Sequence, residues 1–563
     1  MKKEARHNFH ALYALLLVAA FLAGCGGNQT ATPSPSQRTT VHPPSTATRE
    51  ATASPTPAPT PTPVPPLAVE GIEVAADPEV LQVDTTDPHS LLGLCLLNPD
   101  YVDRDKYNQV FHAVQNLEPE LDTSSFKYSR LRMNNLIFTL DTNFLLFYLK
   151  DSKVSKNGKK ATFTYTGDRA HILHDTETFH ARLGHLIHDV APEDYNDLQK
   201  LAALYDAVCR MSNYTANIDD VKTWSPYSIV TRGEGICSGY AMLMRYLLNQ
   251  SGVEAECVSN EPHAWNIVKI NGKWYHSDTT WGAGNAGDTV NTLRTMLMDD
   301  AARVTSLKDG GLMSGGFTMN GNVVNIVPPP PCTDASYNTY AKTGWSYALD
   351  LEGQSVYFAG NNGIERMNLD CTGRQTILPG VYAFQMEFFN GNLYYVDSND
   401  GYLYQAGKDA KPVQLFHDAM VSQIKLEKAK LIYQYNQDEK PVTGSIELLP
   451  EAVGVLSAPS LKTLPEASTP RGSSFCFKVR FLKQMDPATN WNNLVYLVGQ
   501  DGQAIPLHFL LDTTGTLLTV RPKTCLVDEG AVSLLLSPTI LSADGAQLEN
   551  PCRMDVRIEA SKP

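Results

Sequence analysis

The chain has no excess of basic residues. Its 563 residues include 46 Lys and Arg against 60 Asp and Glu, for a formal net charge of -14. It therefore lacks the positive surface with which proteins hold nucleic acid, and nucleic acid is not an expected partner. After Cys25 it also lacks any apolar run of the roughly 20 residues that a transmembrane helix needs. A chain of this length predicts several domains instead of one core.

Metal-binding spacing is also absent from the chain. None of the ten cysteines has the spacing of a zinc site. Two pairs within one predicted helical stretch have i,i+3 spacing, but no matching carboxylates or cysteines accompany its five histidines, His171, His174, His180, His185 and His188. We therefore expect no metal and no cofactor. Disulfides are permitted in an exported protein, and any pairing within the last domain stays open among Cys476, Cys525 and Cys552.

The N-terminus predicts export. Lys2, Lys3 and Arg6 precede an apolar stretch from Ala11 to Leu22, which is too short to span a membrane comfortably. The stretch ends in Leu22-Ala23-Gly24-Cys25, which resembles a bacterial lipobox. The resemblance implies removal of residues 1–24 as a signal peptide, lipid on Cys25, and a place on the extracytoplasmic face of the cell membrane. The alternatives are an ordinary signal peptide or an uncleaved anchor.

Composition divides the rest of the chain. Residues 25–66 are a predicted disordered tether, rich in Thr and Pro, with a polyproline-like reach on the order of 100 Å. An α+β region is expected at 67–190, with strand-like runs at 136–140 and 161–165 and a hairpin turn at Asn157-Gly158. Residues 191–327 follow, up to a boundary of four prolines at 328–331.

The C-terminal part predicts β structure. Val356-Tyr357-Phe358, Leu393-Tyr394-Tyr395 and Leu431-Ile432-Tyr433 recur about every 37 to 38 residues. This period predicts a β-repeat domain at 332–456 that resembles a partial propeller. After a second linker, short alternating strands at 475–560 resemble a bacterial Ig-like β-sandwich.

Three segments of the middle region carry candidate chemistry. Gly233-Glu234-Gly235-Ile236-Cys237 places a cysteine where a helix is predicted to begin, at 238–249. The helix dipole and the exposed N–H groups at such an end stabilise a thiolate. The other two segments are His263-Ala264-Trp265-Asn266 and Lys273-Trp274-Tyr275-His276-Ser277-Asp278-Thr279-Thr280-Trp281.

The turn between the last two segments fixes their register. Asn271-Gly272 predicts a two-residue hairpin in which paired positions sum to 543, so that Asp278 faces Trp265. His263 and Asp278 then become diagonal neighbours on one face. Asp278 can orient the imidazole, and His263 can serve Cys237 as a base. His276 is a weaker candidate, and the two tryptophans are interpreted as packing residues.

The Gly-x-Cys-x-Gly-Tyr-Ala, His-Ala-Trp-Asn and Trp-Tyr-x-x-Asp-x-Thr-Trp patterns, in this order, resemble the transglutaminase-like superfamily over about residues 195–285. The resemblance implies a papain-like core, in which the helix bearing the cysteine packs on an antiparallel sheet. It implies Cys237 as nucleophile, His263 as base and acid, and Asp278 as orienting group. It also implies Tyr227 as support for an oxyanion.

The predicted fold class is therefore multidomain, α+β and β. The resemblance implies cysteine-dependent action on amide bonds of a protein or peptide substrate, with hydrolysis preferred over crosslinking. The alternative is a non-catalytic module that retains the fold and binds the cell surface or the cell wall.

Overall fold

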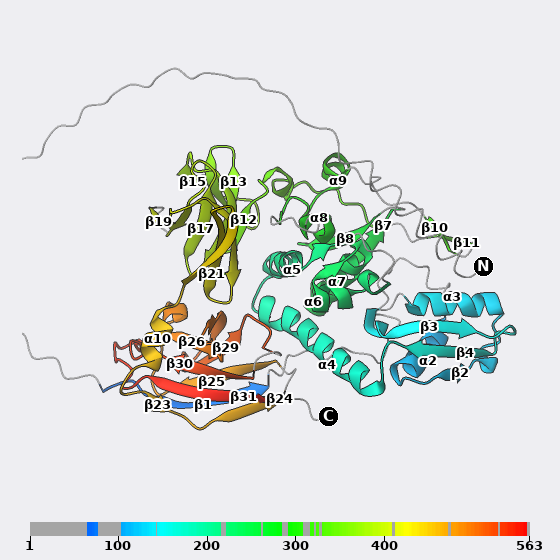
Figure 1. Ribbon diagram of the computed structural model, residues 1–563, viewed down its shortest axis with the longest axis horizontal. Coiled ribbons are helices and arrows are strands. Elements are labelled where there is room, and N and C mark those ends of the chain that lie inside the picture. Colours follow the sequence, from blue (N-terminus) through cyan, green and yellow to red (C-terminus); the bar gives the residue numbers. More distant parts are fainter. Residues whose placement is uncertain are drawn as a thin grey trace, which may run out of the picture. The chain divides into compact units, whose positions relative to one another are not determined.

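The computed structural model describes most of the chain after the tether (Figure 1). The described residues are 65–76, 103–141, 144–215, 221–260, 263–283, 291–307, 316–319, 322–325, 329–407, 411–470, 474–526 and 530–559. The described residues from 66 onward belong to one compact unit. The predicted signal peptide, Cys25 and nearly all of the tether lie outside the described residues. Within the described ranges, no helix has the length and apolar character to cross a membrane.

The first region combines helices with a small antiparallel sheet of order β2-β4-β3. Its elements are α2 (Arg104–Gln115), β2 (Glu120–Asp122), α3 (Arg130–Asp141), β3 (Leu149–Val154), β4 (Lys160–Tyr165) and α4 (Arg169–His185). The predicted hairpin at Asn157-Gly158 joins β3 to β4, with Gly158 at φ +72°. The strand predicted at 161–165 is β4.

The strand predicted at 136–140 is wrong, because these residues are part of α3. Met133, Leu136, Ile137 and Leu140 are all buried. Their spacing is that of one helix face, and the run of β-compatible residues within it is too short to override packing on that face.

The middle region is built around a helix packed on an antiparallel sheet of order β7-β8-β9. Its main elements are α5 (Asp197–Met211), α6 (Pro226–Arg232), α7 (Cys237–Gln250), β7 (Ala255–Ser259), β8 (Ala264–Ile270), β9 (Lys273–Ser277), α8 (Thr279–Ala283) and α9 (Asp300–Ser306). The side-chain amide of Asn266 on β8 and the thiol of Cys257 on β7 both donate to the carbonyl of Ala241 on α7. These bonds fix the helix against the sheet.

Three successive antiparallel sheets follow, β12-β13-β14-β15, β16-β17-β18-β19 and β20-β21-β22. The three repeated sequence motifs lie in β13 (Ser355–Gly360), β17 (Asn392–Asp397) and β21 (Lys430–Gln437), the second strand of each sheet. The remaining strands are β12 (Tyr347–Asp350), β14 (Gly363–Asn368), β15 (Gln375–Pro379), β16 (Ala383–Phe389), β18 (Leu403–Ala406), β19 (Pro412–Phe416), β20 (Val421–Glu427) and β22 (Lys440–Glu447). The repeat is therefore structural, while its propeller interpretation stays a prediction.

The last region has two sheets with a shared hydrophobic core. One has the order β1-β25-β29-β28, with β1 (Val69–Ala76), β25 (Phe475–Phe481), β29 (Leu517–Pro522) and β28 (Leu507–Leu511). The other has the order β23-β31-β30-β26-β27 with β24 beside β31, and comprises β23 (Lys462–Thr463), β24 (Ala467–Pro470), β26 (Val495–Gly499), β27 (Ala504–Ile505), β30 (Ala531–Leu536) and β31 (Cys552–Glu559).

Strand β1 joins this last region although it lies some 400 residues earlier in the chain. It pairs antiparallel with β25, for example Ile72 with Val479. The sequence grouped residues from Leu67 onward with the region up to residue 190, and the structure instead uses 69–76 to complete a C-terminal sheet. Local composition cannot reveal such a partner, because strand pairing depends on long-range register.

Candidate active site

Cys237 is the first residue of α7. Ile236 before it is extended and offers no side-chain acceptor for the helix N-terminus. The first amide groups of α7 therefore lack a side-chain cap, and Cys237 lies at the positive end of the helix dipole. At the other end, Ser251 ends α7 and Gly252 follows at φ +88°.

The hairpin of β8 and β9 has the predicted register. Ile270 pairs with Lys273 and Asn266 with Ser277, so that paired positions sum to 543. Asn271 and Gly272 have φ values of +51° and +77°, as a type I′ turn requires. The predicted pairing of Asp278 with Trp265 is wrong. The strand pairing ends at Ser277, and α8 begins at Thr279.

His263 and Asp278 nevertheless meet, one residue before β8 and one after β9. Nε2 of His263 lies 2.8 Å from Oδ2 of Asp278. The Asp278 carboxylate is fully buried, and its Oδ1 accepts the backbone N–H of Trp281 at 3.2 Å. Its backbone carbonyl accepts the hydroxyls of Tyr205 and Thr295. These contacts hold both the carboxylate and the backbone carbonyl of Asp278 in place.

The Cys237 thiol acts on the same imidazole, since it is among the groups that raise the pKa of His263. Because Asp278 occupies Nε2, Nδ1 is the ring nitrogen left for the thiol. Burial opposes the charge on His263, but the charge and hydrogen bond of Asp278, together with Cys237, outweigh it and raise the pKa of His263 to about 10. Burial also opposes the charge on Asp278, yet the His263 charge holds the pKa of that carboxyl below its usual value.

Trp265 and Trp281 flank this imidazole in different ways. The Trp265 ring is buried and stacks on His263, with centroids 5.8 Å apart and planes 11° apart. Trp281 keeps 37% of its surface exposed, and its ring meets His263 edge-on at 6.3 Å. The packing interpretation therefore describes Trp265, whereas Trp281 presents an apolar surface beside the imidazole.

Tyr227 has other partners in the structure. Its hydroxyl donates to Asp175 at 3.3 Å, and its ring stacks on Phe147 with centroids 3.7 Å apart. Support of an oxyanion by Tyr227 would require this bond to be exchanged. Burial raises the pKa of Tyr214 of β5 (Asn213–Tyr214), and a charge on Cys237 would raise it further. No motif marks Tyr214, and the sequence did not indicate it.

His276 supports the site from behind. Its Nδ1 accepts the indole N–H of Trp265 at 2.9 Å, and its Nε2 lies 2.9 Å from Oδ1 of Asp300. The indole is only a donor, so the His276 proton sits on Nε2. Burial lowers the pKa of His276, which keeps the ring neutral.

The same histidine belongs to a group with metal-ligand chemistry. Ligand atoms of His276, Asp300 and Cys332 all lie within 4.8 Å of one another. A metal ion on Nε2 would require the ring proton to move to Nδ1, which would break the bond from Trp265. Burial also raises the pKa of the Cys332 thiol to about 12. The hydrogen bonds of this group therefore favour a structural role.

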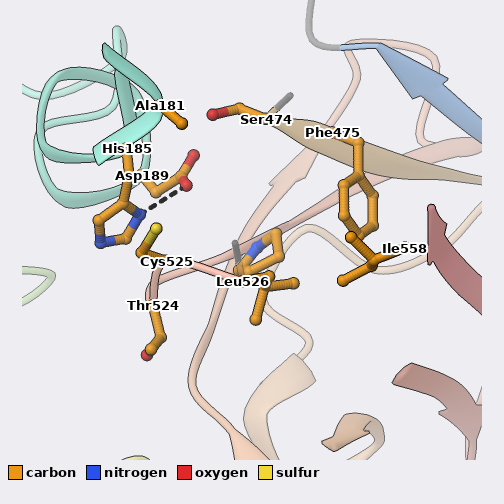
Figure 2. A pocket seen from close by; sticks show the side chains of 10 residues that line it. Ala181, His185, Asp189, Ser474, Phe475, Thr524, Cys525, Leu526 and Ile558 are labelled. Carbon is orange, nitrogen blue, oxygen red and sulfur yellow. Dashed lines mark hydrogen bonds and ion pairs between the residues drawn. The ribbon is translucent and has the colours of Figure 1, made fainter. Parts of the chain in front are cut away.

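The other cysteines do not form disulfides in the described part of the chain. No disulfide joins Cys476, Cys525 and Cys552 to one another. Cys525 lines a small cavity of about 20 Å³ together with His185 and Asp189 (Figure 2). Nδ1 of His185 lies 2.8 Å from Oδ2 of Asp189. This volume holds about one water molecule and no peptide segment. None of the three candidate active-site residues lines it.

Comparison with known proteins agrees with this geometry. The profile of the transglutaminase-like superfamily matches residues 185–279. These residues form a transglutaminase-like domain. Its matched segment ends one residue after Asp278 and so spans all three candidate catalytic residues.

The relatives resemble only part of the chain. The kyphoscoliosis peptidase of Homo sapiens is 27% identical over 180 residues, and that of Mus musculus is 28% identical over 142 residues. These alignments cover 29% and 22% of this chain, and 27% and 21% of the two relatives. The chain thus spans about a quarter of the length of the curated relatives that it matches.

Among solved structures, a crystal structure of a TGase is 15% identical with a TM-score of 0.17, covering 23% of this chain and 44% of the other. A crystal structure of a nidogen/laminin complex is 14% identical with a TM-score of 0.18, covering 38% of this chain and 86% of the other. Scores this low establish no shared fold.

Proposed function

We propose that the chain is an exported, membrane-anchored cysteine enzyme that acts on amide bonds of proteins or peptides. One observation carries the catalytic part of the proposal: a thiol at a helix N-terminus shares a buried imidazole with a buried carboxylate at 2.8 Å. This is the arrangement in which a histidine activates a nucleophile and is itself oriented by a third group.

The reaction begins with attack of the Cys237 thiolate on the carbonyl carbon of the amide. The forming C–S bond pushes the carbonyl electrons onto oxygen, and the N–H of Cys237 is one donor available to that oxyanion. The imidazolium of His263 gives its proton to the nitrogen of the leaving amine as the C–N bond breaks. The products of this half-reaction are a thioester on Cys237 and a free amine.

Hydrolysis is the preferred second half-reaction. Water adds to the thioester, its proton passes to His263, and the C–S bond breaks to release a carboxylic acid and the Cys237 thiolate. The name of the relatives, peptidase, supports hydrolysis over transfer to a second amine. The exposed face of Trp281 supports a substrate with an apolar side chain near the scissile bond.

Location at the membrane depends on Cys25. Several acyl chains on this residue would hold the protein firmly, and the tether would carry the enzyme away from the bilayer toward the cell wall. Full-length protein expressed in bacteria should partition into detergent, and the Cys25→Ala variant should remain in the aqueous phase. Equal partitioning of the two proteins would contradict the anchor without affecting the enzymatic proposal.

The enzymatic proposal is tested by thiol labelling with iodoacetamide, read peptide by peptide by mass spectrometry. Cys237 should react faster at neutral pH than Cys371, a half-buried free thiol outside the site. Turnover of a peptide-amide library should vanish in Cys237→Ala and persist in Cys371→Ala.

Failure of turnover would favour the alternative function. Slow labelling of Cys237, with no turnover on the library, would contradict the enzyme. If the wild type and Cys237→Ala then bound purified cell wall equally well, the chain would act as a wall-binding module.

A further inference from the structure

Arg303 is a fully buried cation beside the candidate active site. It lies on α9, beyond the segment 185–279 that matches the superfamily profile. Asp299 caps α9 by accepting the N–H of Ala302, and Met298 exchanges two backbone hydrogen bonds of 2.8 Å with His276 on β9. These bonds hold α9 at the β9 edge of the β7-β8-β9 sheet and bring Arg303 to the site.

The Arg303 guanidinium contacts two members of that site. Its Nη2 lies 3.9 Å from Oδ2 of Asp278, the same oxygen that lies 2.8 Å from Nε2 of His263. Its Cζ lies 4.2 Å from the centroid of Trp265, the ring that stacks on His263. Arg303 therefore shares one carboxylate oxygen with the imidazole and also contacts the indole that the imidazole lies against.

Few cations compensate the negative charge of Asp278 in this buried place. The other titratable groups whose pKa the Asp278 charge affects are Tyr205 and Cys209 on α5 and His276 on β9. Burial raises the pKa of Tyr205 and of Cys209 well above their usual values and lowers the pKa of His276, so all three are neutral. Within the described ranges, the cations that lower the pKa of Asp278 are those of His263 and Arg303.

A buried carboxylate without a counter-ion is costly. When His263 gives its proton to the leaving amine, Asp278 loses one of its two cations. Arg303 keeps the carboxylate compensated at that moment, and by sharing Oδ2 it weakens the hold of Asp278 on the imidazolium proton.

We propose that Arg303 is a positioning residue of this site, the buried counter-ion of Asp278 that lets His263 release its proton. The inference rests on the proposed function and adds to it a residue outside the matched segment. It makes Arg303, Asp278 and His263 one electrostatic unit. Trp265 packs against the guanidinium of Arg303 and the imidazole of His263.

The pH dependence of Cys237 alkylation in the full chain tests this role without a known substrate. The rate rises first when the thiolate forms beside the imidazolium. It rises again when the imidazolium loses its proton and no longer holds the thiolate. The second step therefore reports His263.

Arg303→Met should move the second step upward by about 1 pH unit, because a cation next to the pair is removed. Arg303→Lys keeps the charge and should leave the step near its wild-type pH. Arg245→Met is the matched control, since Arg245 on α7 pairs with Glu256 at 3.1 Å and should leave both steps in place. Two steps at their wild-type pH in Arg303→Met would overturn the inference.

If Arg303→Met does not fold, the double variant Asp278→Asn with Arg303→Met carries the test. Removing both charges should restore a cooperative thermal transition that Arg303→Met lacks. A double variant no better folded than the single one would overturn the pairing. A wild-type Cys237 that reacts no faster than Cys371, with no two-step profile, would instead contradict the proposed function itself.

Discussion

Gly282 on α8 packs directly against the hydroxyl of Tyr205 on α5. A Cβ atom at this position would overlap that hydroxyl and would lie 2.8 Å from Sγ of Cys209. The same Tyr205 hydroxyl donates to the carbonyl of Asp278 at 3.2 Å. Close packing of two helices thus positions the backbone of the candidate orienting residue.

Gly282→Ala should therefore lower both stability and reactivity. Overpacking of this kind costs about 1–3 kcal/mol. Displacement of Tyr205 should also slow alkylation of Cys237. Thermal unfolding and peptide-resolved alkylation measure the two effects.

Gly272→Ala provides the comparison. Gly272 has a φ of +77° with no atom near the added Cβ, so only backbone strain of about 1–2 kcal/mol is expected. Gly272→Ala should lower the stability of the protein. At temperatures well below unfolding, the alkylation rate of Cys237 should stay near the wild-type rate. Equal slowing in both variants would contradict a specific role for the contact between Gly282 and Tyr205.

Asp278→Asn should reduce turnover of a peptide amide by about 10²–10⁴-fold. The amide keeps the size of the side chain but removes the charge that stabilises the imidazolium. Asp300→Asn is the matched control, because Asp300 binds His276 and not His263. Turnover that survives unchanged in Asp278→Asn would contradict the orienting role.

The charges of His263 and Asp278 predict a pH window for stability. The pKa of His263 is raised from 6.5 to about 10, so its contribution is fully present below pH 6.5 and is lost as pH rises toward 10. The pKa of Asp278 is lowered from 3.8, so its contribution is present above pH 3.8 and is lost as pH falls below that value.

The difference in melting temperature between the wild type and Asp278→Asn should therefore be largest near pH 5–6 and should shrink by pH 10. Differential scanning calorimetry across this range checks the trend. A difference that grows with pH would have the wrong sign for this ion pair.

Trp265→Phe should keep most of the stacking on His263 and remove the indole N–H. Nδ1 of the buried His276 would lose its donor, at a cost of about 1–3 kcal/mol. Trp274→Phe is the control on the same hairpin, because Trp274 is only partly buried. Chemical denaturation of both variants measures the difference, and equal losses would contradict a specific role for the hydrogen bond.

Local sequence predicted the elements that local physics governs. The Asn271-Gly272 turn predicted the register of β8 and β9, and the apolar spacing after Cys237 predicted α7. At 136–140 the same reasoning failed, because a short apolar run fits either period and packing decided for the helix. The recurring motifs were found because each lies at the same place in its sheet.

The residues of the candidate site fall into two groups, those that the sequence predicted and those that it missed. Cys237, His263 and Asp278 were predicted because each lies at the end of an element that its neighbours in sequence define. Arg303 and Tyr205 were missed because they reach Asp278 from α9 and α5, and no spacing along the chain encodes that approach. Tyr227 was expected near the oxyanion, and tertiary packing places its hydroxyl on Asp175 instead.

The sequence by itself determined the turn, the nucleophile-bearing helix and the order of cysteine, histidine and aspartate, because these depend on backbone geometry within a few residues. Only the tertiary structure decided which buried groups compensate Asp278 and which strand completes the C-terminal sheet. Burial and long-range pairing set the cost of a charge or an unpaired strand edge, and both depend on neighbours that lie far away in the sequence.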